Sequence, residues 1–577
     1  MDERWTRADA RPWPARVLAL VVALLVTGPA LAPGFVLLRD MVFVPRQDLD
    51  LDALGLGGSL PRAVPVDAVM GLVTGVLPGD WLQKLVLVAT VYCAVLGAAR
   101  LVPPGPDGRR GAAGLVAGLV YGWSPYVAER LLIGHWTLLV AYAALPWIAR
   151  AALRVRAGAP GALPRLLVAC APAALSPTGS LLAGGLVLVL VGRSRLLLAG
   201  GGVLVLSLPW IVAGVLHPGG GTSDPAGVAA FATRGENWAG PVLSVLGTGG
   251  LWNSGAVPGS RASVLAPVLT LVLVAVAVAG WAPREVRTAP ARGLLALGGA
   301  GVLLACAGVL PGATELVEAA VRWVPGAGLL RDGQKWAAWW ALPLAAGAGL
   351  GARRIAAVVA ARGGARVLGG VVLAGLVAVP VVALPDLAWG VGGRLRPVDY
   401  PQDWQRVREA LADRDGDVLV LPFGAYRAFG WNDDRPQLDP ASRWLPRPVV
   451  TDDALFVGGV AVEGEDPRAR RAAAAADDPA QLARLGIGWV LVERGTPGRA
   501  VPDAVDDLPV VVDGEELRLH RVPGAAPSPS PSPVRVTAVG GAHALALGVC
   551  GVAVLWITAT ASTVTGRRPP SWKRVPR

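Results

Sequence analysis

The sequence lacks the short motifs that mark the common soluble enzyme classes. It holds no Walker phosphate-binding loop, no GxGxxG entry to a nucleotide-binding fold, no GxSxG nucleophile elbow and no HExxH zinc motif. These absences argue against an ATP-driven pump, a Rossmann enzyme and a serine or zinc hydrolase encoded within this chain.

Cysteine and charge are also scarce. The four cysteines lie in separate apolar runs without metal-ligand or CxxC spacing, so neither a zinc site nor a disulfide framework is predicted. Only 16% of the 577 residues are charged whereas 53% are hydrophobic, a composition too apolar for an ordinary soluble domain. The formal net charge of +12 comes without a basic patch interleaved with aromatic residues. We therefore predict no nucleic-acid partner and attribute the charge to membrane topology and to membrane lipids with anionic headgroups.

Long apolar runs alternate with two kinds of loop. Seven short stretches hold 25 Lys and Arg residues, and the segments between them hold most of the acidic residues. Arginine and lysine in short loops stay on the cytoplasmic face of a membrane. The pattern predicts a multi-pass plasma-membrane protein with cytoplasmic N- and C-termini and with basic loops at 1–16, 100–110, 150–165, 193–195, 284–292, 353–366 and 567–577.

The apolar runs predict about twelve membrane segments, because a hydrocarbon core about 30 Å thick needs about 20 apolar residues per helix. Two short runs are flanked by arginines expected on the cytoplasmic side, which predicts a re-entrant or broken hairpin turning at Ser176–Ser180. The first run predicts an uncleaved helix in preference to a signal peptide cleaved near Ala30–Ala32. The candidate segments are 16–37, 82–101, 111–124 with 137–153, 164–176 with 180–192, 196–216, 263–282, 292–311, 336–352, 367–387 and 538–562.

By composition the chain divides into a multi-span membrane domain, an extracytoplasmic α/β domain, a Pro/Ser linker, a final transmembrane helix and a basic cytoplasmic tail. Within the polar domain, Asp415–Phe423 and Ile487–Glu493 predict buried strands, and Leu508–Val522 predicts a hairpin. The Pro/Ser run predicts a stiff, extended linker. The alternation of basic loops predicts that 388–537 lies outside the cytoplasm. The predicted fold is an α-helical polytopic membrane protein with these five parts: 1–387, 388–525, 526–537, 538–562 and 563–577.

Charged residues at the outer ends of the helices are the candidates for chemistry. Asp40 closely follows the first apolar run, and a carboxylate beside a low-dielectric region can be tuned as a general base. Asp48, Asp50 and Asp52 alternate with leucine. On a strand their carboxylates would share one face, and such hard oxygen ligands suit a divalent cation as a cofactor. A solvated acidic loop explains the same pattern.

Glu129, Arg130 and His135 interrupt an otherwise apolar stretch. A charge there costs about 2.5–3.5 kcal/mol on insertion scales, so such residues line a cavity or pair with one another. The guanidinium of Arg130 is well shaped to bind a phosphate. The alternative is an outer loop in which Glu129 and Arg130 are hydrated.

Two further outer segments carry candidates for substrate or phosphate binding. Arg331, Asp332 and Lys335 lead into a tryptophan-rich helix. They indicate either a cationic site for an anionic lipid headgroup or residues that anchor the helix at the membrane interface. Arg234 and Glu236 form a weaker candidate pair. In the outer domain, the run Trp431–Asp434 has residue types that can grip a sugar, although solvation of a loop is the favoured explanation.

Four features occur in order along the chain: Asp40 in the first outer loop, YGWSPYVAERLLIGHW at 121–136, GLWNSGAVPGSR at 250–261 and GLLRDGQKW at 328–336. Followed by a late α/β outer domain, they resemble the C-type membrane glycosyltransferase superfold, in particular the membrane part of cell-wall arabinofuranosyltransferases. The resemblance covers roughly 1–525.

This resemblance implies an enzyme of the bacterial plasma membrane that transfers a sugar from a polyprenyl-phosphate lipid donor to a cell-envelope glycan acceptor on the outer face. It implies that Asp40 deprotonates the acceptor hydroxyl and that Arg130, Arg331 and Lys335 are phosphate contacts. It also implies that the outer domain holds the acceptor glycan.

Two other functions are compatible with the sequence. A transporter or flippase of lipid-linked glycans often shows inverted halves with broken helices at corresponding positions, and only one broken region, 164–192, is evident. A non-catalytic scaffold of envelope assembly would use the outer domain to bind a partner and the helices as an anchor. Replacing Asp40 by Asn separates a transferase from both, because only a general base needs the ionisable oxygen.

Overall fold

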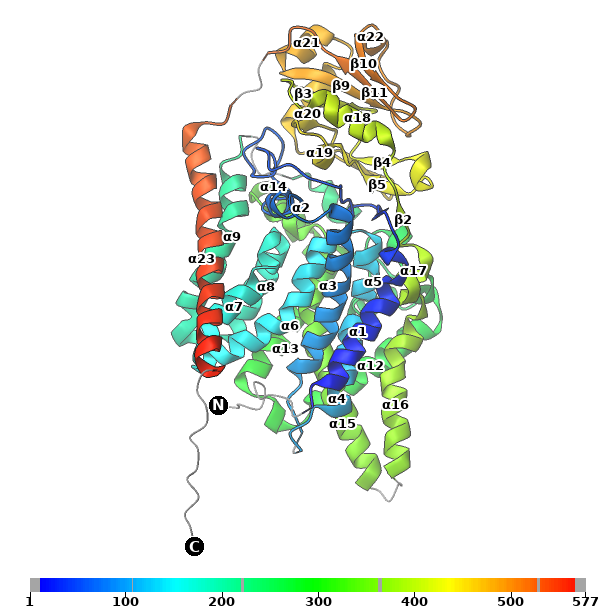
Figure 1. Cartoon of the computed structure of the whole chain (residues 1–577). Coiled ribbons are helices and arrows are strands. Elements are labelled where there is room, and N and C mark those ends of the chain that lie inside the picture. The colour runs from blue at the N-terminus through cyan, green and yellow to red at the C-terminus, as the bar shows by residue number, and fades with distance from the viewer. Residues whose placement is uncertain (1–10, 106, 219–222, 362–365, 527–529, 566–577) are drawn as a thin grey trace.

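The computed structural model describes residues 11–105, 107–218, 223–361, 366–526 and 530–565. It is a bundle of long helices with a smaller α/β domain at one end (Figure 1). The last helix, α23 (Pro533–Thr565), runs along the side of the bundle against α9 (Arg193–Val215). Residues 527–529 of the predicted linker and 566–577 of the predicted basic tail lie outside the described residues.

The helical part contains long helices and the short helices of their connecting loops. Its other elements are α1 Trp13–Thr27, α2 Val66–Thr74, α3 Gly79–Leu101, α4 Gly111–Gly122, α5 Pro125–Leu132, α6 Trp136–Arg156, α7 Ala162–Cys170, α8 Pro177–Leu190, α10 Ala226–Ala230, α11 Gly240–Leu246, α12 Leu265–Trp281, α13 Ala289–Cys306, α14 Ala313–Trp323, α15 Ala337–Ala361, α16 Arg366–Ala383 and the left-handed turn α17 Ala388–Gly393.

Among the described residues, seven helical stretches are long and apolar enough to cross a membrane, or eight if the bent pair of α16 and 385–393 is one span. The described residues therefore contain fewer full-length membrane spans than the roughly twelve membrane segments predicted from the sequence. The runs predicted at 111–124 and 263–282 form α4 and α12, helices of 12 and 17 residues. At 1.5 Å per residue even α12 is only about 26 Å long. These short helices are held by packing against the longer α15.

The bundle is tight where small residues meet. A Cβ added to Gly280 of α12 would lie 2.1 Å from the carbonyl oxygen of Gly347 in α15. Small residues let membrane helices approach closely, and this contact replaces the hydrophobic driving force that is missing between helices in lipid. The break predicted at Ser176–Ser180 is also present, since α7 ends at Cys170 and Ser176 caps α8 by accepting a bond from the Gly179 amide at 3.1 Å.

The α/β domain is built on a five-stranded sheet in the order β10-β11-β9-β3-β6. Strand β3 lies parallel to both of its neighbours, and β10 and β11 form an antiparallel edge. The strands of this sheet are β3 Asp417–Leu421, β6 Val449–Val450, β9 Ile487–Glu493, β10 Val510–Asp513 and β11 Leu517–Arg521. All five residues of β3 and most of β9 are buried, as expected for parallel strands covered on both faces.

Helices and two small hairpins complete the domain. One hairpin, β4 Tyr426–Ala428 with β5 Pro436–Leu438, follows β3, and the other, β7 Leu455–Val457 with β8 Val460–Val462, follows β6. The helices are α18 Gln402–Leu411, α19 Ala441–Trp444, α20 Pro467–Ala474, α21 Pro479–Arg484 and α22 Asp503–Asp506. Both hairpins therefore follow the carboxyl ends of parallel strands, the edge at which open α/β sheets bind ligands.

The domain is fastened to the first loop of the bundle. Strand β1 (Phe35–Val36) pairs with β2 (Pro397–Val398) in antiparallel register. Further along the same loop, the Arg39 amide donates to the Pro436 carbonyl at 2.6 Å, and the Arg39 carbonyl accepts from the Leu438 amide at 2.7 Å. These bonds hold the loop, and with it the next residue, Asp40, between the bundle and the domain.

Candidate functional site

A cavity of about 830 Å³ lies between the helical bundle and the α/β domain. Its size is in the range of small-molecule sites, 300–1,000 Å³. The bundle contributes Arg39, Asp40, Ile133, His135, Phe231, Arg234, Trp252, Asn253, Ser254, Gly328, Leu329, Arg331, Asp332 and Lys335, and the domain contributes Gly424, Ala425, Tyr426, Pro436 and Ala454–Gly458. Six of the candidate site residues predicted from the sequence therefore meet at one cavity.

Asp40 lies in this cavity with both carboxylate oxygens oriented by hydrogen bonds. Oδ2 is 2.8 Å from His135 Nε2, and Oδ1 accepts a hydrogen bond from the Tyr426 hydroxyl. Burial raises the pKa of Asp40, but the bonds from His135 and Tyr426 outweigh it, so the net pKa lies below its ordinary value. Burial and the neighbouring Asp40 charge hold the pKa of Tyr426 well above its usual range. Asp40 is therefore a carboxylate at neutral pH and Tyr426 a neutral donor.

His135 is held in one tautomer by Arg130. The Arg130 Nη1 atom lies 2.6 Å from His135 Nδ1. A guanidinium can only donate hydrogen bonds, so Nδ1 accepts and the imidazole proton is assigned to Nε2, which donates to Asp40. A proton on Nδ1 would point directly at the N–H donor of Arg130. His135 therefore presents an N–H group to Asp40.

Arg130 is itself neutralised by the protein. Its guanidinium, fully buried, bonds both carboxylate oxygens of Asp332 at 2.6 and 3.0 Å and donates through Nε to Gln334 at 2.8 Å. Burial raises the pKa of Asp332, but the Arg130 charge overcomes this and lowers it to about 2. Arg130, predicted as a phosphate contact, thus lies behind the cavity wall and orients His135 and Asp332.

The backbone around Asp40 is constrained on both sides. Arg39 adopts φ of 48°, a left-handed conformation that side-chain-bearing residues rarely adopt. On the opposite side, the Asp40 amide donates to the Ile133 carbonyl at 3.1 Å. Gly134 makes this approach possible, because it has φ of 83° and a Cβ there would lie 2.2 Å from the Met41 nitrogen. Strained residues held by their surroundings often occur at functional sites.

Three cationic side chains line the cavity beside Asp40. Arg331 pairs with Glu465 of the domain at 2.9 Å and stacks over Phe231 with its guanidinium carbon 5.7 Å from the ring centroid. Lys335 is buried, and among the described residues its ammonium has no hydrogen bond or ion pair. It lies 5.7 Å from the Trp336 ring centroid and within the electrostatic influence of Asp332. Arg234 is exposed and its guanidinium likewise bonds to none of the described residues. Lys335 and Arg234 can therefore accept an anion without breaking an existing bond.

Glu129 and Glu236, predicted as substrate contacts, do not line the cavity. Glu236 pairs with buried Arg261 at 2.7 Å and accepts from the Gly250 amide at 2.6 Å. Glu129 accepts from the Leu251 amide at 3.0 Å. The two carboxylates hold the loop that precedes Trp252.

The interpretation of 48–52 as a strand with a shared carboxylate face was wrong. The segment is irregular and ends in a turn. Asp48 pairs with Arg408 at 2.6 Å and Asp50 accepts from the Ala53 amide at 2.8 Å, so each carboxylate already has a separate partner. Within the described ranges no group of three His, Cys, Asp or Glu side chains could hold a metal ion. Asp52 therefore does not join Asp48 and Asp50 in a divalent-cation site.

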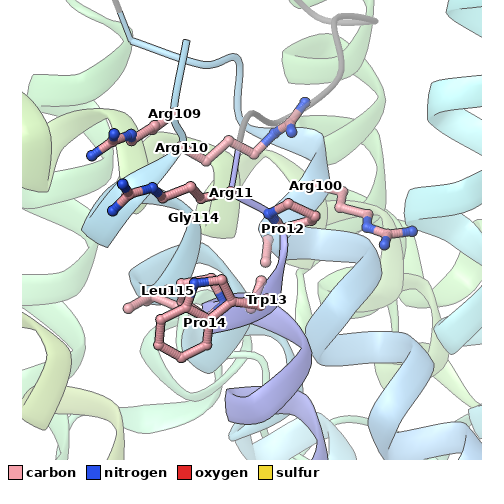
Figure 2. A pocket seen from close by; sticks show the side chains of 12 residues that line it. Arg11, Pro12, Trp13, Pro14, Arg100, Arg109, Arg110, Gly114 and Leu115 are labelled. Carbon is pink, nitrogen blue, oxygen red and sulfur yellow. The ribbon is translucent and has the colours of Figure 1, made fainter. Parts of the chain in front are cut away.

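A second cavity, of about 220 Å³, lies between the starts of α1 and α4 and the end of α3, where basic residues gather (Figure 2). Arg11 and Arg109 extend to one side of it and Arg100 and Arg110 to the other. No acidic side chain is among its lining residues in the described part of the chain. This cavity offers no general base, so the cavity at Asp40 is the candidate site.

Tyr426 was not predicted from the sequence. The available signal was its place shortly after the strand at 417–421, at the carboxyl edge of the sheet. The predicted sugar-gripping run, 431–434, has another use: Asn432 is buried and donates to the Leu37 carbonyl at 3.2 Å, which helps to join the domain to the bundle.

Comparison with known proteins identifies a shared fold. No family model and no curated protein matches the chain. A cryo-EM structure of arabinofuranosyltransferase AftD from mycobacteria matches 91% of this chain at 18% identity with a TM-score of 0.55. Two structures of a single-residue variant of that enzyme match 91% and 89% of the chain at 17% and 15% identity, with TM-scores of 0.55 and 0.53. The chain spans 40–42% of the length of these structures. The resemblance predicted from the sequence is confirmed at the level of the fold.

Proposed function

We propose that this chain is a membrane glycosyltransferase that moves a sugar from a polyprenyl-phosphate donor to a hydroxyl of a cell-envelope glycan, at the extracytoplasmic face of the membrane. One observation carries the proposal: an ionised carboxylate, Asp40, shares a cavity with Lys335, Arg234 and Arg331. The fold similarity to an arabinofuranosyltransferase supports the same reaction class.

Asp40 has the role of general base. Each of its oxygens accepts one hydrogen bond from the protein, which leaves lone pairs for the acceptor hydroxyl. As that hydroxyl oxygen attacks the anomeric carbon, its proton passes to Asp40. The bond from the anomeric carbon to the donor phosphate breaks, and the electron pair leaves with the phosphate.

The cationic side chains stabilise the leaving phosphate. Lys335 and Arg234 are available to the anion directly, and Arg331 can reach it when its pair with Glu465 opens. Preorganised positive charge aimed at developing negative charge is the usual means of stabilising such a transition state. His135, oriented by Arg130, positions Asp40 and is not itself a base, because its only free proton position faces a guanidinium donor.

The test compares wild-type protein with Asp40→Asn in a deletion strain of the source organism, with lipid-linked sugars and envelope glycans measured by mass spectrometry. We expect donor lipid to accumulate and one glycan residue to be lost with Asp40→Asn, because general bases contribute about 10²–10⁴-fold in rate. The matched control is Asp433→Asn, an exposed carboxylate of the domain outside the cavity lining. Full restoration by Asp40→Asn at equal protein level would refute the proposed base.

A further inference from the structure

Helix α14 has three distinct faces. Val321 is fully buried and points toward the protein. Leu316 and Trp323, seven residues apart and therefore on one stripe, are 73% and 76% exposed. Between these faces lies a charged stripe of Glu315, Glu318 and Arg322. A helix with an exposed apolar stripe beside a charged one is typical of the membrane–water interface.

Helix α14 is connected to the cavity at Asp40 by direct packing. It packs against α10 and against the short 3-10 turn Ala327–Leu330. That turn supplies Gly328 and Leu329 to the cavity wall, and α10 in turn packs against β8 of the domain hairpin. The helix that carries the exposed apolar stripe therefore neighbours an element of the cavity wall.

The cavity wall on this side is apolar. It is formed by Phe231, Trp252, Leu329 and, from the hairpin, Leu455–Val457. Phe456 is 77% exposed although it lines a cavity. A sugar favours aromatic faces with polar partners, whereas this wall mixes aromatic and aliphatic side chains. It adjoins the cation Arg331, which stacks on Phe231. Such a wall beside a cation suits a phosphate that carries an aliphatic chain.

We propose that the isoprenoid tail of a polyprenyl phosphate enters between α14 and the hairpin β7–β8, with Leu316 and Trp323 in the hydrocarbon layer and Phe456 against the units nearest the phosphate. This inference rests on the proposed function and adds the side of entry and the residues that contact the tail. Leu303 of the preceding helix α13 is also exposed, so a further apolar side chain is available to the lipid on the helix that leads into α14.

The test is photolabelling of the full chain in lipid nanodiscs with a C15 isoprenyl phosphate that carries one diazirine on its first isoprene unit and one on its terminal isoprene unit. We expect labelled peptides from 313–331 and 455–462, and we expect unlabelled polyprenyl phosphate to compete. The same probe with a hydroxyl in place of the phosphate should label these segments at least fivefold less. Labelling confined to other faces, such as α16 or α1, or labelling that does not respond to the competitor, would overturn the proposal.

Two variants test whether labelling depends on the apolar stripe of α14. Leu316→Glu and Trp323→Glu place a charge on the apolar stripe, and both sites are exposed, so the core is untouched. We expect labelling to fall at least fivefold in each. The control Glu315→Gln, on the charged stripe, should stay within twofold of wild type. Equal labelling in all variants at an unchanged thermal midpoint would show that the tail does not pass along α14.

Failure of this inference is distinguishable from failure of the proposed function. If transfer depends on Asp40 but the label maps elsewhere, the entry route is wrong and the transferase stands. If the label maps to α14 and the hairpin but Asp40→Asn retains full transfer activity, the lipid route stands and the proposed chemistry is wrong.

Discussion

Replacing Tyr426 by Phe tests whether the tyrosine hydroxyl sets the pKa of Asp40. The substitution removes one hydroxyl, which donates to Asp40 Oδ1, and leaves the ring in place. Hydrogen bonds to charged groups contribute about 1.5–3 kcal/mol. Tyr426 is 37% exposed, so solvent screening favours the low end of this range. Loss of this bond removes stabilisation of the charged form, so the pKa of Asp40 should rise.

The assay is the pH dependence of kcat/KM for sugar transfer. Asp40 acts as a base only when ionised, so the rate falls as the pH drops through its pKa. In the wild type this acid limb lies below the ordinary aspartate value of 3.8, because the pKa is lowered. In Tyr426→Phe the limb moves to higher pH, because the bond that lowers the pKa is lost. At pH 7.5 Asp40 is ionised in both proteins, so the rates there should agree within about threefold.

The control is Tyr400→Phe, which removes a hydroxyl bonded to the Phe43 carbonyl, away from Asp40. Its acid limb should coincide with that of the wild type. An unchanged limb in Tyr426→Phe would refute the assigned hydrogen bond. A loss of about 100-fold at pH 7.5 would show that Tyr426 acts on the substrate directly.

Three other predictions concern single residues. Lys335→Met should raise the KM for the lipid donor about tenfold, equivalent to about 1.4 kcal/mol. The control is Lys84→Met, since Lys84 pairs with Asp80, and it should leave the KM unchanged. Equal KM values for both variants would remove Lys335 from the phosphate site. Gly134→Ala should lower the thermal midpoint far more than Gly111→Ala, because both have positive φ but only Gly134 lacks room for a Cβ; similar losses would contradict this. Burial and the nearby Asp50 charge raise the pKa of Asp52 to about 7, so ionisation of Asp52 costs stability as pH rises from about 4 to 7. Asp52→Asn should therefore raise the midpoint more at pH 8 than at pH 5, and an equal gain at both pH values would contradict the raised pKa.

The sequence was informative where a charge stood out against an apolar background. Asp40 was identified as a carboxylate at a membrane boundary, His135 as a polar residue within an apolar stretch, and Asp332 and Lys335 as charges before a tryptophan-rich helix. All four line the same cavity. The strand Ile487–Glu493 was found at its observed bounds because a run buried on both faces is continuous in the sequence.

The sequence was uninformative where the partner comes from a remote segment. Nothing local to Asp40 predicts Tyr426, which lies 386 positions further along the chain. Arg130 has the residue type of a phosphate ligand, but its partners Asp332 and Gln334 lie more than 200 positions away and occupy it. The alternation at 48–52 is compatible with a strand or a turn, and only the distant Arg408 shows that the carboxylate of Asp48 is used in an ion pair.

The hydrogen bonds that hold the loop of Asp40 between the bundle and the α/β domain have a consequence for biogenesis. The segment that carries Asp40 leaves the ribosome early, but Pro436 and Leu438, which bond its neighbour Arg39, and Tyr426 are made about 400 residues later. At about 5–20 residues per second, the loop spends roughly 20–80 s in the membrane before these partners exist. A chain interrupted before the second hairpin strand would therefore form its helices yet hold an unaligned carboxylate, so translation itself delays the assembly of the site until the α/β domain has been made.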